Sequence, residues 1–447
     1  MSKTTAFILF SALLLMRPPL HAEEATLSKE HCTRLAFQAR CNFGEHVLGK
    51  WFPRSVDKGR GGFIQDYSED WSEKRDGDKT LVYQSRLTWM AAQIVLGIGA
   101  TNYGADSEHG LNFLADKMWD KENGGFYWGV DPFGKARGDR AGTEKHMYGI
   151  AFALYAASTN YKATMNPKAL ELAIRTFVWM DVHAHDEKHG GYFEALDLHG
   201  KPMLEIPKHP DEPSSDFIGT RYGVKSMNTH IHILEALTAF YEVHPEKEVR
   251  ERLKEIFEIV RDKICVMPGA MHLYFNPDWT PVPDLDSFGH DLETAYLLVE
   301  AAAALGQHQD AKTWAMARGL VDHALEFGWD AKLGGFYDEG GTFRKVWITD
   351  KVWWVQAEGL NALLLLADYC ARENQPVQAE RYAKAFVKEW EFIQKFQIDA
   401  KHGGWITMVN ADGSAKPGQS KSDQWKEPYH QGRALLNVIE RLERMAQ

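Results

Sequence analysis

A glycine-pair motif recurs along the chain and limits the folds open to it. Five times the sequence runs Asp, three further residues, Gly-Gly and an aromatic residue. Successive copies lie 63 to 69 residues apart, except for one interval of 144, where Met271–Phe275 resembles a worn copy. Self-similarity at a fixed period indicates a repeat architecture, here of six units. The aspartates that open the five intact copies are Asp57, Asp120, Asp186, Asp330 and Asp399.

Apolar residues at helical spacing predict twelve helices, two per unit. The Gly-Gly-aromatic segments carry turn residues and short aromatic runs, so they predict small β-hairpins between one helix pair and the next. Helix pairs stacked into a ring bury a continuous core without capping repeats. We therefore expect an all-α (α/α)6 toroid with short hairpins, formed as one domain by residues 23–447. The helices are predicted near 27–51, 81–98, 106–118, 145–158, 167–183, 226–242, 246–264, 290–305, 309–327, 351–370, 376–395 and 429–445.

The N-terminal 22 residues have the pattern of a signal peptide. Lys3 precedes an apolar run from Ala6 to Met16, and cleavage is expected after about Ala22. The run is shorter than the roughly 20 residues that span a bilayer, and no later segment is long and apolar enough. We expect a periplasmic or secreted protein, a monomer or homodimer. The net charge of −11 argues against nucleic acid or an anionic membrane as a partner.

The four cysteines are too few for a disulfide scaffold. Cys32 and Cys41 lie close together in a chain expected to be exported, so the sequence allows a disulfide between them. Cys265 and Cys370 are predicted to be buried thiols. The 15 tryptophans and 16 tyrosines fit either a large core or a sugar-stacking site.

Polar side chains gather at the starts of alternate predicted helices. Asn228 and His232 are four residues apart and share a helix face. If alternate helices form the inner ring, all six starts point to one end of the toroid. The helix dipoles would add positive potential there, which suits a transient oxyanion. The side chains expected to meet are Arg86, Tyr148, Asn228, His232, His290, Trp354, Glu358 and His430.

Carboxylates accompany the histidines of these helices. Glu293 follows His290 by three residues, and a carboxylate beside an imidazole fixes its tautomer and raises its basicity. Each such group also has a structural interpretation: buried ion pairs, a helix-start histidine at His430, and a snorkelling surface arginine at Arg86. The histidine pairs two residues apart, including the structural His230, point to different helix faces. We therefore expect no catalytic metal, and the chain lacks a dinucleotide-binding fingerprint, so we expect no cofactor.

Five ordered motifs carry a family resemblance over essentially the whole predicted mature chain. They are Ser85–Trp89, Asn228–Ala236, Gly289–Glu293, Trp353–Glu358 and Trp425–His430. The chain resembles the N-acylglucosamine 2-epimerases, and among them the cellobiose 2-epimerases, which are α/α-toroid enzymes. The resemblance implies epimerisation of an aldose at C2 without a redox cofactor, by two bases on opposite faces of the opened sugar.

The resemblance also implies a role for each matching residue. His290 and His430 would be the acid/base pair, while His232 and Arg86 would assist ring opening and stabilise a cis-enediolate. Tyr148 and Asn228 would bind hydroxyls, Trp354 and Trp425 would stack on sugar rings, and Glu293 and Glu358 would orient the catalytic imidazoles.

Two features depart from the family pattern. Tyr296 stands where many relatives have tryptophan, and the signal peptide is unusual because familiar members are cytoplasmic. Export favours a free or polymer-derived disaccharide such as cellobiose or mannobiose as substrate. An aldose–ketose isomerase acting on mannose, an N-acylglucosamine 2-epimerase, a glycoside hydrolase and an inactive sugar-binding protein remain alternatives.

Overall fold

The computed structural model describes residues 27–206, 213–282, 285–343 and 346–447. The predicted signal peptide lies outside this part of the chain. Within it, none of the helices combines the length and the apolar character needed to cross a membrane.

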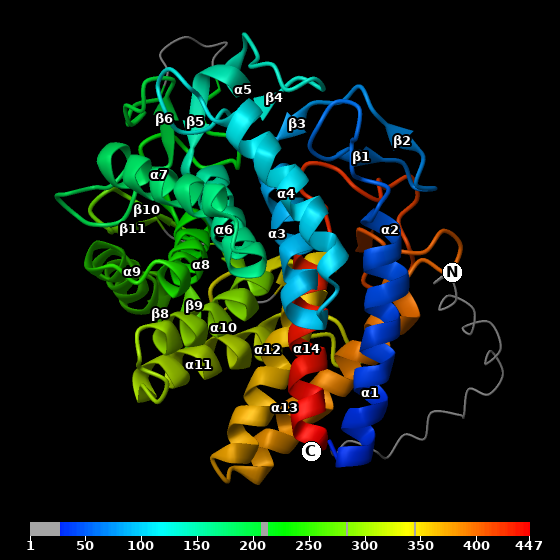
Figure 1. The fold of residues 1–447 in the computed structure, drawn as a ribbon. Coiled ribbons are helices and arrows are strands. Elements are labelled where there is room, and N and C mark those ends of the chain that lie inside the picture. The colour runs from blue at the N-terminus through cyan, green and yellow to red at the C-terminus, as the bar shows by residue number, and fades with distance from the viewer. Residues whose placement is uncertain (1–26, 207–212, 283–284, 344–345) are drawn as a thin grey trace, which may run out of the picture.

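Six helices form a closed inner ring (Figure 1). Each packs on the next one along the chain, and the sixth returns to the first. The first of them is buried at all but a few positions, because it is covered by its ring neighbours and by an outer helix. The inner helices are α3 (Leu81–Ile98), α6 (Met147–Thr164), α8 (Met227–Val243), α10 (Phe288–Ala304), α12 (Trp353–Arg372) and α14 (Tyr429–Ala446).

Six outer helices each pack mainly on one inner helix, and the predicted twelve-helix toroid is confirmed. Helix α1 packs on α14, so the two ends of the described chain meet and close the ring (Figure 1). Four outer helices continue into π-helical turns, η1 (Phe43–Leu48), η3 (Leu114–Met118), η4 (Val260–Ile264) and η5 (Ile393–Gln397). The outer helices are α1 (Lys29–Asn42), α4 (Gly104–Phe113), α7 (Pro167–His183), α9 (Lys247–Ile259), α11 (Ala311–Phe327) and α13 (Pro376–Phe392), and the short helices are α2 (Gly49–Trp51), η2 (Thr101–Tyr103) and α5 (Arg140–Thr143).

Short antiparallel strands connect neighbouring units at one end of the ring. Strands β3, β5, β7, β12 and β15 each run directly into an inner helix, and each pairs with a strand from further along the chain. This pairing fixes where these five inner helices start. The pairs are β1 (Asp66–Tyr67) with β2 (Glu73–Lys74), β3 (Lys79–Thr80) with β4 (Gly129–Val130), β5 (Glu144–His146) with β6 (Ala195–Asp197), β8 (Cys265–Val266) with β9 (Ala270–Met271) and β15 (Lys351–Val352) with β16 (Met408–Val409); the triples are β7 (Lys225–Ser226), β10 (Tyr274–Phe275) and β11 (Pro281–Val282), and β12 (Asp286–Ser287), β13 (Glu339–Gly340) and β14 (Val346–Ile348).

The glycine pairs are required by the backbone of the turns they occupy. Gly124 and Gly125 have φ of 70° and 68°, in the left-handed region that favours glycine. A Cβ on Gly125 would also lie 2.8 Å from the Trp179 ring. The residue before the motif aspartate bridges to the motif aromatic, as Trp119 does to Phe126. Cys265 pairs with Met271 in the same way, which confirms the worn sixth copy.

Each intact motif aspartate is paired with a buried lysine, which we call a turn lysine. Lys145 Nζ, for example, lies 2.8 Å from Asp120 Oδ2 and also donates to the Gly124 carbonyl. The other oxygen of Asp120 accepts backbone N–H groups of its own turn. Burial of two charges is tolerated here because they neutralise each other. The pairs are Lys79–Asp57, Lys145–Asp120, Lys225–Asp186, Lys351–Asp330 and Lys421–Asp399.

The disulfide that the sequence allowed does not form. Cys32 and Cys41 are both unpaired, one buried and one exposed on helix α1. Nine residues of α-helix rise about 13.5 Å, whereas a disulfide needs Cα atoms within about 7 Å. Cys265 and Cys370 are buried thiols, as expected.

Candidate active site

The two histidines expected to share a reaction lie against one tryptophan. The ring centroid of Trp354 is 4.7 Å from that of His290 and 5.4 Å from that of His430. These residues come from three inner helices, α12, α10 and α14, and each lies within the first turns of its helix. All three side chains stand near the N-terminal ends of their helices, so both imidazoles lie at one end of the ring.

The other predicted aromatic residues continue this row of contacts. The Tyr148 ring lies 6.4 Å from Trp425 and packs edge-on against His232 at 5.2 Å. Tyr429 then lies 6.5 Å from His232 and 4.8 Å from His430. A continuous series of rings thus joins Trp425, from the loop before α14, to the histidines.

A carboxylate fixes the orientation of His430. Its Nδ1 donates to Glu358 Oε1 at 2.5 Å, which leaves Nε2 as the proton acceptor. The other oxygen of Glu358 accepts the hydroxyl of Tyr296 at 2.6 Å, and Arg433 donates to Oε1 at 2.8 Å. Tyr296 therefore holds the carboxylate that orients His430.

The predicted pairing of Glu293 with His290 is wrong. His290 Nδ1 lies 2.7 Å from the hydroxyl of Ser287, the last residue of strand β12. Glu293 instead accepts from Arg433 at 2.5 Å and lies 3.9 Å from His430 Nδ1. The buried Arg433 guanidinium, one turn after His430 on α14, carries a full positive charge. It therefore attracts the Glu293 carboxylate more strongly than the neutral His290 imidazole does.

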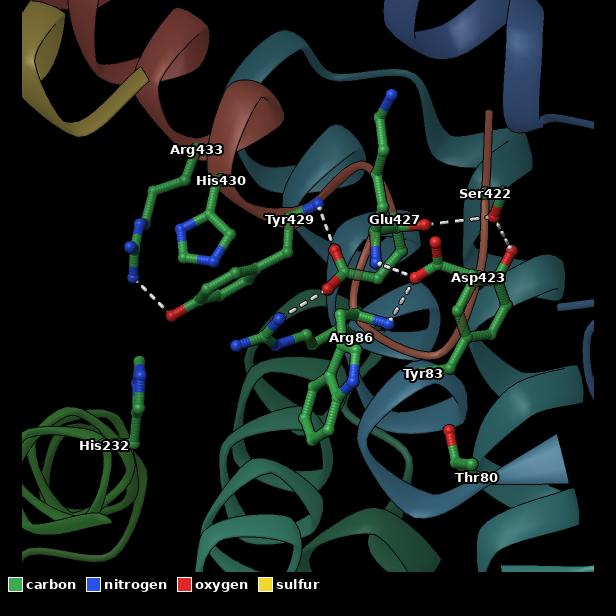
Figure 2. A network of polar contacts seen from close by, with 12 residues as sticks. Thr80, Tyr83, Arg86, His232, Ser422, Asp423, Glu427, Tyr429, His430 and Arg433 are labelled. Carbon is green, nitrogen blue, oxygen red and sulfur yellow. Dashed lines mark hydrogen bonds and ion pairs between the residues drawn. The ribbon is translucent and has the colours of Figure 1, made fainter. Parts of the chain in front are cut away.

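Sequence reasoning missed Glu235 and Arg433, which stand at the centre of the site. His232 Nδ1 donates to Glu235 Oε2 at 3.1 Å, and Glu235 also accepts from Arg433 and from the Tyr429 hydroxyl. In Figure 2, His232 on α8 faces Tyr429 and Arg433 on α14. The three-residue spacing from His232 to Glu235 was the available signal for this pair.

Arg86 is buried rather than snorkelling, with 2% of its surface exposed. It donates to Glu427 at 2.5 Å (Figure 2). It also donates to the Tyr148 hydroxyl at 3.0 Å. Its guanidinium also lies over the rings of Phe152 and Tyr429, at 4.1 and 4.4 Å from their centroids. These contacts fix one positive charge beside His232, because Phe152 and Tyr148 both touch the His232 ring.

Three predicted binding residues keep surface for a ligand. Asn228, Trp354 and Trp425 are only partly buried. The side-chain oxygen of Asn228 has no hydrogen-bond partner among the described residues. Such a group is satisfied at low cost by a ligand hydroxyl.

Burial sets the protonation of the site. It lowers the pKa of His290 to about 4 and holds the pKa of His430 well below its usual value, so both imidazoles are neutral near pH 7. Burial also raises the pKa of Glu358. It opposes ionisation of Glu235 as well, but Arg433 and His232 outweigh it and lower the pKa of Glu235 to about 2.

Arg433 also bears on whether the site would hold a metal. Glu293, Glu358 and His430 place three possible ligand atoms within 4.8 Å of one another. The Arg433 guanidinium already lies 2.5 and 2.8 Å from the two carboxylates. The Arg433 guanidinium therefore already supplies the positive charge that a metal ion would supply to these two carboxylates.

A family model described as N-acylglucosamine 2-epimerase matches residues 62–434. The chain belongs to the N-acylglucosamine 2-epimerase family. It is 29% identical over 400 residues to the cellobiose 2-epimerase of Bacteroides fragilis, covering 88% of this chain and 95% of the relative. It is 25% identical over 415 residues to the D-mannose isomerase of Marinomonas mediterranea, covering 89% and 95%.

Solved structures agree with these sequence relatives. A cellobiose 2-epimerase from Spirochaeta thermophila superposes with a TM-score of 0.80 at 28% identity, covering 94% of this chain and 99% of the other. The (α/α)6 fold and membership among sugar epimerases, which are isomerases, follow from these matches.

Proposed function

We propose that this protein epimerises the C2 carbon of a reducing-end aldose and interconverts glucose-type and mannose-type sugars. The observation that carries the proposal is the packing of His290 and His430 on the one indole of Trp354. Each imidazole has its Nδ1 engaged, by Ser287 and Glu358, so Nε2 is the nitrogen that can exchange a proton. Two such groups suit removal of a proton from one face of a carbon and return to the other.

The chemistry begins when the sugar ring opens, because C2–H becomes acidic only beside the free aldehyde. One imidazole accepts the C2 proton on Nε2, and the electron pair moves to the aldehyde oxygen to give a cis-enediolate. The other imidazole takes up a proton from water on Nε2 and delivers it to the opposite face of C2, which restores the aldehyde. Glu358 and Glu293, at 2.5 and 3.9 Å from His430 Nδ1, stabilise that ring when it carries the extra proton.

Arg86 and His232 would act on the oxygens of the intermediate. Positive charge fixed in a buried site stabilises a developing oxyanion more strongly than it would in water. Arg86 is held by Glu427 and Tyr148, so it needs no rearrangement when the charge develops. His232 is held by Glu235, and its Nε2 is the nitrogen left to meet a sugar oxygen.

The substrate class we propose is a β-1,4-linked disaccharide such as cellobiose or mannobiose. The cellobiose 2-epimerase relatives support it, and partly buried Trp354 and Trp425 offer ring faces for two sugar units. Asn228, with its unpartnered oxygen, suits a hydroxyl of the bound sugar.

The test is proton NMR of the protein with cellobiose in heavy water. We expect a mannose-type reducing end to appear with deuterium at C2. Product that keeps its original C2 hydrogen would contradict the two-base route, and release of monosaccharides would indicate hydrolysis. Hydrolysis normally needs two carboxylates flanking the bond, whereas the carboxylates here are engaged by arginines and histidines.

An aldose–ketose isomerase is the second candidate, favoured by the D-mannose isomerase relative. It passes through the same enediolate and differs in returning the proton to C1 rather than C2. The same NMR experiment with mannose distinguishes the two, because the isomerase would release fructose.

We also propose that residues 1–22 direct export to the periplasm or medium. Sequencing the N-terminus of protein recovered from the periplasm is expected to start near Glu23. Size-exclusion chromatography is expected to give a monomer or homodimer.

A further inference from the structure

One of the six units replaces its turn lysine with an acidic residue. In four strands that lead into inner helices, a buried lysine stands two residues before the helix starts. Asp286 stands at this position before α10, so the charge is inverted. The partner aspartate is also missing, because Val266 follows Cys265 where Asp120 follows Trp119 in an intact copy. The four lysines are Lys79, Lys145, Lys225 and Lys351.

Asp286 meets a second carboxylate and an imidazole. Asp291 on α10 and His323 on α11 present possible ligand atoms that lie, with those of Asp286, within 4.8 Å of one another. His323 Nδ1 is 2.7 Å from Asp291 Oδ2 and 3.4 Å from Asp286 Oδ2. The exposed fractions are 0% for both aspartates and 4% for His323.

The two aspartates of this cluster have few hydrogen-bond donors around them. Within the described residues, neither carboxylate oxygen of Asp286 has a hydrogen bond, and Oδ1 of Asp291 has none either. Burial and the neighbouring Asp291 raise the pKa of Asp286 to about 8, despite His323 and the nearby N–H groups of Ser287 and Met271. Burial holds the pKa of Asp291 well above its usual value. Two buried carboxylates thus lack the cation that the intact units supply from their own sequence.

We propose that Asp286, Asp291 and His323 bind a divalent transition-metal ion such as Zn²⁺ or Mn²⁺. One imidazole nitrogen and two carboxylate oxygens form a donor set typical of these ions rather than of Ca²⁺. The ion takes the place that the lysine ammonium has in the intact units. Its role is structural, because the cluster joins α10 to α11 behind the start of the helix that carries His290.

Metal binding changes the tautomer of His323. The ring loses the hydrogen of Nδ1 to water and takes one from water on Nε2, so it stays neutral and releases no net proton. The Phe343 amide, now 3.4 Å from Nε2, must turn away. A proton held by either aspartate passes to water when the metal binds, so affinity is expected to rise with pH.

The test is metal analysis of the full-length protein, stripped with a chelator, dialysed against Zn²⁺ or Mn²⁺ and freed of excess ion. We expect about one equivalent per chain by mass spectrometry and a higher Tm than for the stripped protein. Asp286→Asn and His323→Gln are expected to lose at least tenfold in affinity. Exposed Asp412→Asn serves as the control and is expected to bind as the parent does.

Asp286→Lys is the decisive variant, because it restores the residue of the intact units. We expect it to bind no metal at this site and to keep, without metal, a Tm close to that of the loaded parent. The proposal is overturned if the parent binds far less than one equivalent of either ion, or if Asp286→Asn and His323→Gln bind as much as the parent. The readouts do not use the epimerase reaction, so they stand apart from the proposed function.

Discussion

His290 and His430 are separated by 140 residues of sequence, yet both contact the ring of Trp354. Replacing either with alanine removes one of two proton-transfer groups. We expect His290→Ala and His430→Ala each to lose about 10²- to 10⁴-fold in kcat for epimerisation of cellobiose, measured by product chromatography.

The same two variants distinguish a two-base from a one-base mechanism. With one base left, each variant is expected to exchange C2 hydrogen for deuterium on a single epimer without inverting it. Exchange into both epimers by either variant would contradict assignment of one imidazole to each face.

The depressed pKa of His290 links stability to pH. The unfolded histidine takes a proton near pH 6.5, whereas folded His290 resists protonation down to about pH 4. The unfolded state therefore binds more protons in this window, and the free energy of unfolding falls as pH drops from 6.5 towards 4. The contribution is at most about 1.4 kcal/mol per pH unit. Urea denaturation at pH 7 and pH 5 should show a smaller loss for His290→Gln than for the parent; equal losses would contradict the buried neutral imidazole.

Tyr296 acts on His430 through Glu358. Removing its hydroxyl leaves a buried carboxylate oxygen without its donor, which costs about 1–3 kcal/mol of stability. We expect Tyr296→Phe to lower kcat about tenfold, corresponding to about 1.4 kcal/mol in the transition state, with little change in KM. Tyr296→Trp restores a donor, the indole N–H, beside Glu358 and should recover most of this loss. An unchanged kcat in Tyr296→Phe would show that Arg433 alone holds the carboxylate.

At the level of the helices and turns, the buried lysine–aspartate pairs tie each glycine-pair turn to the next inner helix. Lys145→Met leaves Asp120 buried without its cation, which is expected to cost about 3–5 kcal/mol in urea denaturation. Adding Asp120→Asn should recover part of this cost, because it removes the stranded charge. Lys162→Met breaks only the exposed pair with Glu242 and should cost less than about 1 kcal/mol. Similar costs for Lys145→Met and Lys162→Met would rule out a special role for the turn lysine.

The elements could be predicted from the sequence because their signals are local. The glycine pair marks a turn with positive φ in each of the five intact copies of the motif, and helical periodicity needs only neighbouring residues. The inner ring followed from the helix order, and the family motifs named the histidines. The partners of those histidines could not all be found in this way. Ser287 and Arg433 meet them through packing between helices, and the spacing of Glu293 from His290 suggested a contact that Arg433 outcompetes.

At the scale of the whole molecule, the ring closes where α14 packs between α1, α12 and α3. Helix α14, which closes the ring, carries His430 and Arg433. The Arg433 guanidinium forms ion pairs with three carboxylates, one each from α8, α10 and α12. Closure of the barrel and assembly of the site are therefore one event.

Because ring closure also assembles the site, activity can arise only late in synthesis of the chain. Helix α14 emerges from the ribosome after the other five inner helices, so a nascent polypeptide holds His290 and His232 but lacks their counterpart. Such a precursor lacks one of the two bases, so it cannot invert C2 of a sugar even when the other helices have folded. Epimerisation by this protein therefore indicates that α14 has packed into the ring.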